Sequence, residues 1–162
     1  MPVLKFPSGA YVNSNAIEKE LHYVFGKALA KGGVSVDPDY AASQMQMVKT
    51  VWGQMEGKTL HHFILSFSDF ESQRINNIRE LLSLGYHICN LYGNEFQVVF
   101  GVHYSKTYHL HFVMNSVSFC TGRKFVHNKA DDVFLADYIR TCSIPFVFGN
   151  RFNANFLPVY YT

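Results

Sequence analysis

The chain has 162 residues and a net charge of +2, with 48% hydrophobic and 16% aromatic residues. This composition excludes an intrinsically disordered chain, and the length suits a single domain with a substantial core. No apolar run is long enough to span a bilayer, and the first residues lack the pattern of a secretion signal. The three cysteines, Cys89, Cys120 and Cys142, form no CxxC pair, which favours free thiols. We therefore expect a cytoplasmic protein.

Periodic apolar residues predict two helices in the first third of the chain. The first begins at Asn15, with Glu18 in a capping-box position, and ends at "KGG", residues 31–33. Its apolar stripe consists of Ile17, Leu21, Val24 and Ala28. The second follows Asp37 and Pro38, a cap and a first-turn proline. The side chains expected on its buried face are Ala41, Met45, Val48, Trp52 and Met55.

Extended segments alternate with helices in the rest of the chain. "LHHFILSF", residues 60–67, predicts a strand, and Ser68 with Glu71 predicts a capping box for a helix that ends at Gly85. That helix should bury Ile75, Ile78 and Leu82. Two further strands are expected near 95–103 and 108–119, followed by a hairpin turn at "CTGRKF". A helix should then cover 131–141, and the chain should end with extended segments at "IPFVFG" and "FLPVYYT".

This order of elements predicts a single-domain α+β fold. We expect an antiparallel sheet with helices packed on one face, which leaves the other face free to hold a ligand.

Three histidines lie close together in "GVHYSKTYHLHF", residues 101–112. His109 and His111 are two residues apart on a predicted strand, so their side chains project from the same face. Antiparallel pairing with the preceding strand would bring His103 to that face as well. A lone histidine is more often an ordinary core or surface residue, but three neutral imidazoles suit a divalent transition metal such as Mn, Co, Ni or Zn. The spacing therefore predicts a metal site with open positions.

Two other kinds of metal protein fit the sequence less well. A cupin site requires a glutamate three or four residues after the second histidine of the strand, where this chain has Asn115. A structural zinc site requires four ligands, and the cysteines are not spaced to complete them.

The sequence resembles the relaxases, which are mobilization nucleases of the HUH endonuclease superfamily. The resemblance is carried by "AIEKELHYVFGKAL", by the run from "AASQMQMVKTVWGQ" to "HHFILSFSDFE", by "YGNEFQVVFGVH" and by "HLHFVMNSVSFCTGRKF". It implies a HUH-type, palm-like sheet in one relaxase domain over residues 1–162. It also implies site- and strand-specific nicking of single-stranded DNA at an origin of transfer, for plasmid or transposon mobilization.

The resemblance also assigns roles to residues of this chain. Tyr23 would be the nucleophile that forms a 5′-phosphotyrosyl intermediate, and His103, His109 and His111 would bind a divalent metal, Mn²⁺ or Mg²⁺. The expected DNA contacts are Lys27, Lys58, Arg123 and Lys124. Further expected partners are accessory relaxosome proteins and the coupling proteins of type IV secretion, with no membrane contact.

Two alternatives stay open. Ser105 stands where relaxases usually have an aspartate, which allows a catalytically inactive HUH fold that binds single-stranded DNA or a DNA hairpin. Tyr138, in the helical "DDVFLADYIR", would be the nucleophile if the chain resembled the single-tyrosine HUH transposases. The remaining histidines are expected to have no site role: His22, His61, His62, His87 and His127. Among these five histidines, His62 differs because it opens a strand that should lie next to the site.

Overall fold

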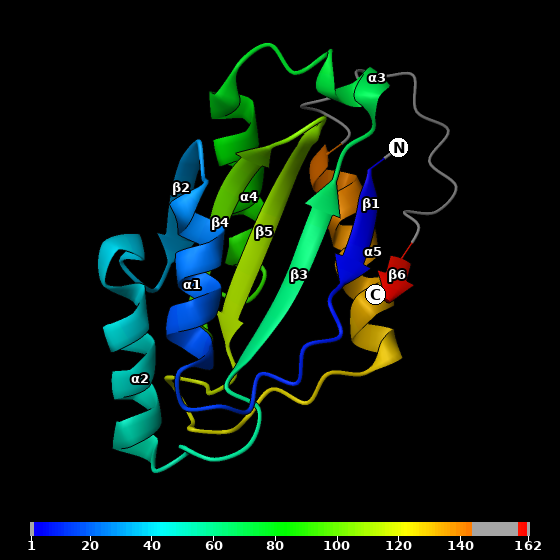
Figure 1. The fold of residues 1–162 in the computed structure, drawn as a ribbon. Helices are drawn as coiled ribbons and strands as arrows, with labels where there is room; N and C mark the ends of the chain where they lie inside the picture. Colours follow the sequence, from blue (N-terminus) through cyan, green and yellow to red (C-terminus); the bar gives the residue numbers. More distant parts are fainter. Residues whose placement is uncertain (1, 144–158, 162) are drawn as a thin grey trace.

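The centre of the protein is a six-stranded sheet with the order β2-β4-β5-β3-β1-β6. A computed structural model of the chain describes residues 2–143 and 159–161 (Figure 1). The strands are β1 (Val3–Phe6), β2 (Ala30–Val34), β3 (Leu60–Ser66), β4 (Val98–Tyr104), β5 (Tyr108–Asn115) and β6 (Val159–Tyr161). All neighbouring strands pair antiparallel except β1 and β6, which are parallel. The predicted antiparallel α+β fold is confirmed.

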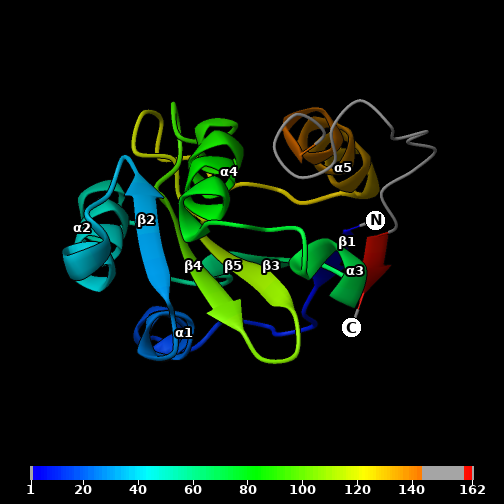
Figure 2. The ribbon, with the colours of Figure 1, turned by 90° about the horizontal axis from the view of Figure 1, so that it is seen from above.

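Helices lie on both faces of this sheet, as the view from above shows (Figure 2). The helices are α1 (Ala16–Gly26), the 3-10 turn η1 (Pro38–Tyr40), α2 (Ala41–Trp52), α3 (Asp69–Ser72), α4 (Ile78–Asn90) and α5 (Lys129–Ser143). Side chains of α4 and α5 pack with Phe100 and Phe112 on one face. Side chains of α1 and α2 pack with Val99 and Val113 on the other.

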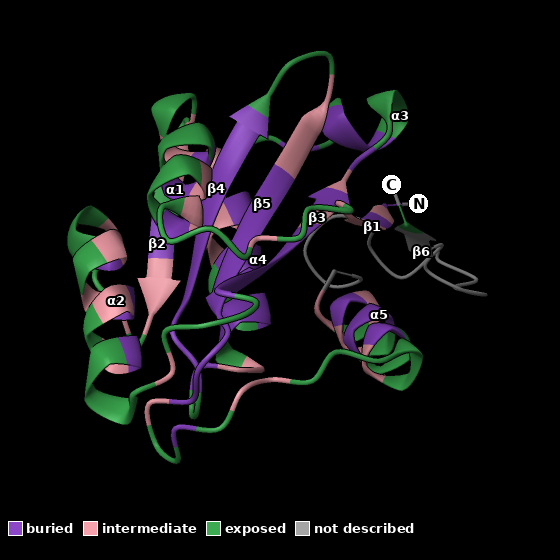
Figure 3. Ribbon diagram, turned by 60° about the horizontal axis from the view of Figure 1, so that its bottom comes forward, coloured by how far each residue is buried: buried purple, intermediate pink, exposed green. Residues whose placement is uncertain are grey.

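Helices thus cover both faces of the sheet, whereas the sequence led us to expect helices on one face only. The reason is that β4 and β5 carry apolar side chains on both faces, so each face needs a partner. Figure 3 shows that these central strands are buried for most of their length, whereas the outer sides of the helices are exposed. The histidine-bearing face is covered at one end by α1.

The segment "KGG" is part of strand β2, and α1 ends earlier, at Gly26. The prediction that "KGG" terminates the helix was wrong. Gly32 pairs with Phe100 of β4, and an added Cβ at Gly32 would lie 2.6 Å from the Phe100 ring. This glycine is therefore explained by close packing within a strand, which a single sequence does not distinguish from a helix stop.

The capping box of Ser68 and Glu71 is present, but its helix α3 has only four residues. A separate helix, α4, begins after Asn77, whose side chain accepts a hydrogen bond from the Arg79 N–H at 2.9 Å. Gly85 lies inside α4, so the prediction that it ends the helix was wrong. An added Cβ at Gly85 would lie 2.2 Å from the Phe100 ring, so Gly85 lets α4 pack close to the sheet.

Helix α2 buries Ala41 and Met45 as predicted, but its third buried residue is Lys49. Val48 is half-buried, and Trp52 and Met55 are exposed, so this part of the predicted apolar face was wrong. The Lys49 ammonium donates to the side chains of Asn115 and Ser116 at the end of β5. Burial, and to a smaller extent Lys124, lowers the pKa of Lys49 to about 8.

The remaining predicted elements agree with the structure where it describes them. In "CTGRKF" the chain turns through Gly122, at φ 70°, and Val117 pairs with Lys124. Helix α5 contains residues 131–141, and β6 lies within "FLPVYYT". "IPFVFG" lies outside the described residues. In the part of the chain that the structure describes, no helix is long and apolar enough to cross a membrane.

Strand β4 and helix α1 approach each other closely at Gly101. An added Cβ at Gly101 would lie 2.8 Å from the Val24 carbonyl oxygen and 3.0 Å from Val24 Cγ1. The carbonyl oxygen belongs to the backbone and Cγ1 to a packed side chain, so neither atom can move aside freely.

We predict that Gly101→Ala lowers the free energy of unfolding by about 1–3 kcal/mol, the usual cost of overpacking. Urea denaturation measures this change. Gly26→Ala is the matched control, because an added Cβ at Gly26 meets no atom within 4 Å. Equal stability of Gly101→Ala and wild type would contradict the close approach of α1 to β4.

Candidate metal centre and active site

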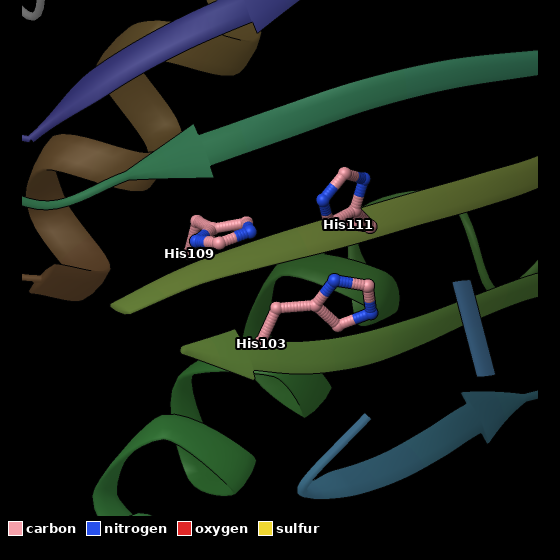
Figure 4. Close-up of side chains that lie close together, drawn as sticks. All are labelled: His103, His109 and His111. Carbon is pink, nitrogen blue, oxygen red and sulfur yellow. The ribbon is translucent and has the colours of Figure 1, made fainter. Parts of the chain in front are cut away.

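The three predicted ligands meet on the face of the sheet that α1 covers (Figure 4). His103 on β4 is paired directly with His109 on β5, and His111 lies one side-chain repeat further along β5. One potential ligand atom from each ring lies within 4.8 Å of those of the other two. His103 and His111 are buried, and His109 is half-buried. The antiparallel hairpin of β4 and β5 therefore builds the cluster that the sequence spacing predicts.

Each of the three rings has one nitrogen in contact with an acceptor from the protein. His103 Nε2 lies 2.5 Å from the Val24 carbonyl oxygen, and His109 Nδ1 lies 3.2 Å from the Thr107 carbonyl oxygen. His111 Nδ1 lies 3.0 Å from His62 Nε2. When the ring N–H groups donate to these partners, the second nitrogen of each ring keeps a free lone pair. The donor set therefore fits a metal ion.

Burial favours the neutral imidazole at two of the three rings, His109 and His111. Burial lowers the pKa of His111 to about 3, and the neighbouring His62 and His103 contribute in the same direction. Burial also lowers the pKa of His109. A neutral imidazole is the form that binds a metal, so these rings need not lose a proton near pH 7 to do so.

Tyr23 on α1 lies beside this cluster. Its ring centroid is 5.4 Å from that of His111 and 6.2 Å from that of His103, and both contacts are edge-on. The tyrosine is 52% exposed, in contrast to the buried Val24 that follows it. The fold thus brings together Tyr23 and the three histidines, the four residues that the resemblance connects.

The expected DNA-contact residues do not all lie near this cluster. Lys27 is exposed and caps the end of α1, about one turn after Tyr23. Lys58, Arg123 and Lys124 lie near the other end of the sheet, where Leu60 pairs with Asn115. That end is six residues along β5 from His109, or roughly 20 Å at about 3.3 Å per residue. The Lys124 ammonium donates to the Glu56 carbonyl.

The alternative nucleophile lies elsewhere. The Tyr138 hydroxyl donates to the His87 carbonyl at 2.9 Å, which joins α5 to α4 on the opposite face of the sheet. This position places the sheet between Tyr138 and the histidine cluster. Ser105, where the resemblance leads us to expect an aspartate, is exposed between β4 and β5.

His62 contacts His111, so the expectation that it has no convergent partner was wrong. It pairs with Val113 of β5, and its side chain shares the face of His111. Its Nδ1 also lies 3.0 Å from the Glu20 carboxylate on α1. The sequence showed that His62 lies on a strand, but the contact depends on the pairing of β3 with β5.

Comparison with known proteins shows the family and the fold of this chain. Residues 17–142 match the family model described as the nuclease domain of MobA/VirD2-like relaxases. The chain belongs to this family. Two proteins from Staphylococcus aureus, both described as protein rlx, are 28% and 30% identical over 124 and 118 residues, which are 76% and 72% of this chain. The chain spans only 38% and 36% of the length of these relatives.

A solved structure shows the same fold. It comes from work on the molecular basis of vancomycin resistance transfer in Staphylococcus aureus. The TM-score is 0.66, and the match covers 98% of this chain and 97% of the other, at 8% sequence identity.

We predict that the metal-free protein binds one Mn²⁺ ion and that His109→Ala abolishes this binding, because three imidazole donors are reduced to two. Isothermal titration calorimetry measures both affinities. His22→Ala is the control, since His22 is an exposed histidine of α1. Unchanged affinity in His109→Ala would show that the ion binds elsewhere.

Proposed function

We propose that the chain is the nicking domain of a mobilization relaxase. In this proposal it cleaves one strand at an origin of transfer, with Tyr23 as nucleophile and a divalent cation held by His103, His109 and His111. The observation that carries the proposal is the position of the exposed Tyr23 ring, 5.4 Å from His111, in a member of the relaxase family.

The reaction is a transesterification. The Tyr23 hydroxyl oxygen forms a bond to the scissile phosphorus, the bond from phosphorus to the 3′ oxygen breaks, and the phenolic proton is lost as the 3′ hydroxyl gains one. A bound divalent cation supplies Lewis-acid stabilisation of the charge that develops on the phosphate. Since one phosphodiester replaces another, the 5′-phosphotyrosyl product can be rejoined by the reverse reaction.

The histidines and α1 perform separate tasks in this proposal. The three rings hold the cation, which is Mn²⁺ or Mg²⁺, and α1 presents Tyr23 at its edge. Lys27, about one turn from Tyr23, contacts a phosphate near the cleaved bond, and Lys58, Arg123 and Lys124 contact the strand farther away. Relaxosome proteins and type IV coupling proteins remain the proposed partners, in the cytoplasm.

We predict that Tyr23→Phe abolishes nicking, because the phenyl ring keeps the packing but lacks the attacking oxygen. The assay measures cleavage of labelled single-stranded oligonucleotides in the presence of Mn²⁺, with a set of oligonucleotides that together cover the candidate origin. Mass spectrometry then locates the nucleotide adduct. Tyr138→Phe is the matched control and should nick at the wild-type rate. An adduct on another tyrosine, or nicking by Tyr23→Phe, refutes the assignment. DNA binding by the wild type with no cleavage would favour the inactive binding module.

We also predict tighter binding of single-stranded origin DNA than of the matched blunt duplex, because the nucleophile must reach the backbone of an unpaired strand. Fluorescence anisotropy across a salt series measures both affinities. Lys27→Ala should reduce the slope of log affinity against log salt by about 0.7, the value for one phosphate contact to a single strand. Lys19→Ala, another exposed lysine of α1, should not change it. Equal affinity for both DNAs would count against an unpaired substrate.

A further inference from the structure

Two side chains outside the histidine cluster continue it toward α1. The Glu20 carboxylate lies 3.0 Å from His62 Nδ1, and His62 Nε2 lies 3.0 Å from His111 Nδ1. The His62 side chain is 3% exposed and the Glu20 side chain 17% exposed. The His62 and His111 rings are stacked, with centroids 5.2 Å apart. The result is a row of close polar contacts from a helix carboxylate to a candidate metal ligand, in which the contact between His62 and His111 is a hydrogen bond.

The contacts in the row favour one arrangement of its protons. A carboxylate oxygen 3.0 Å from Nδ1 is attracted to that nitrogen only when the nitrogen carries the hydrogen, so the contact favours a proton on His62 Nδ1. In a neutral His62, Nε2 then has only a lone pair, so His111 donates through Nδ1. The free lone pair of His111 is thereby left on Nε2. Each contact in the row favours one proton position in the next, and the last one favours Nε2 as the nitrogen of His111 that binds a metal.

We propose that Glu20 and His62 are positioning residues that orient His111 and increase its strength as a metal ligand. The proposal rests on the metal site of the proposed function. Ligand histidines usually donate their second N–H to a carboxylate, a carbonyl or water, and these partners strengthen metal binding. His103 and His109 donate to main-chain carbonyls, whereas His111 alone is linked to a carboxylate.

Tyr11 closes the outer end of the row. Its hydroxyl lies 3.1 Å from the same His62 Nδ1, and burial followed by the charge of Glu20 raises the pKa of Tyr11 to about 12. Its backbone has a φ of 48°, in the left-handed region that non-glycine residues rarely adopt. The Thr59 N–H and hydroxyl both donate to the Tyr11 carbonyl at 2.8 Å. These bonds hold the tyrosine over the Glu20–His62 pair.

The first test measures metal affinity without reference to activity. Isothermal titration with Mn²⁺ on the metal-free protein should show about 10- to 100-fold weaker binding for Glu20→Gln and for His62→Phe, the range found when such supporting residues are lost. Glu18→Gln is the matched control, because it makes the same chemical change at an exposed position of α1. Its affinity should equal that of the wild type. Circular dichroism melting confirms that each variant is folded.

The second test reads the proton positions directly. Long-range ¹H–¹⁵N correlation spectra of the metal-free protein at pH 7.5 should show both His62 and His111 protonated on Nδ1. Glu20→Gln should remove this preference at His62, and Glu18→Gln should preserve it. A purely structural role for Glu20 would not change the tautomer of a histidine on another element.

The outcomes separate this inference from the proposed function. If the wild type binds Mn²⁺ and nicks DNA, but Glu20→Gln and His62→Phe bind the ion within about twofold of wild type, the positioning role is overturned and the nuclease proposal stands. His62 or His111 protonated on Nε2 in the wild type overturns it as well. If the wild type binds no metal, the proposed metal site fails first, and the positioning role fails with it.

Discussion

The arrangement of the candidate site depends on one contact, between the imidazole of His103 and the carbonyl of Val24. The last carbonyls of a helix have no partner within the helix, and Val24 lies in the last turn of α1. The His103 N–H satisfies this carbonyl at 2.5 Å, and Gly101, two residues earlier on the same face of β4, leaves room for the approach. Together with the apolar packing of α1 on Val99 and Val113, this hydrogen bond fixes the helix on the sheet, occupies one nitrogen of His103, and holds the adjacent Tyr23 beside the cluster.

The same docking explains why the site draws on distant parts of the chain. Tyr23 and Glu20 are three residues apart on α1, so they lie about one turn from each other on the helix surface. One reaches the edge of the histidine cluster and the other reaches His62 on β3. A shift of α1 along β4 would therefore change the position of the nucleophile and the support of the metal ligand together.

The sequence predicted those features that depend on local pattern. The spacing of His109 and His111 determined that their side chains share a face, and the run before His103 predicted the strand that pairs with them. Residues whose role depends on tertiary neighbours were missed. "KGG" lies in an edge strand because Gly32 packs on Phe100, and Lys49 is buried because Asn115 and Ser116 accept hydrogen bonds from its ammonium group. The contact between His62 and Glu20 requires both the β3–β5 pairing and the docking of α1, and neither is encoded in a short motif.

The uncharged ligand set has a consequence for how the protein would respond to its two ligands. A divalent cation bound by three neutral imidazoles keeps its formal charge of 2+, and Glu20 lies two rings away from it. A backbone phosphate is then the natural counter-ion of the centre. By thermodynamic linkage, the cation and the DNA strand change each other's affinity equally. If the bound cation increases the affinity for the strand by some factor, the bound strand increases the affinity for the cation by the same factor. Metal and DNA would therefore be retained together and released together.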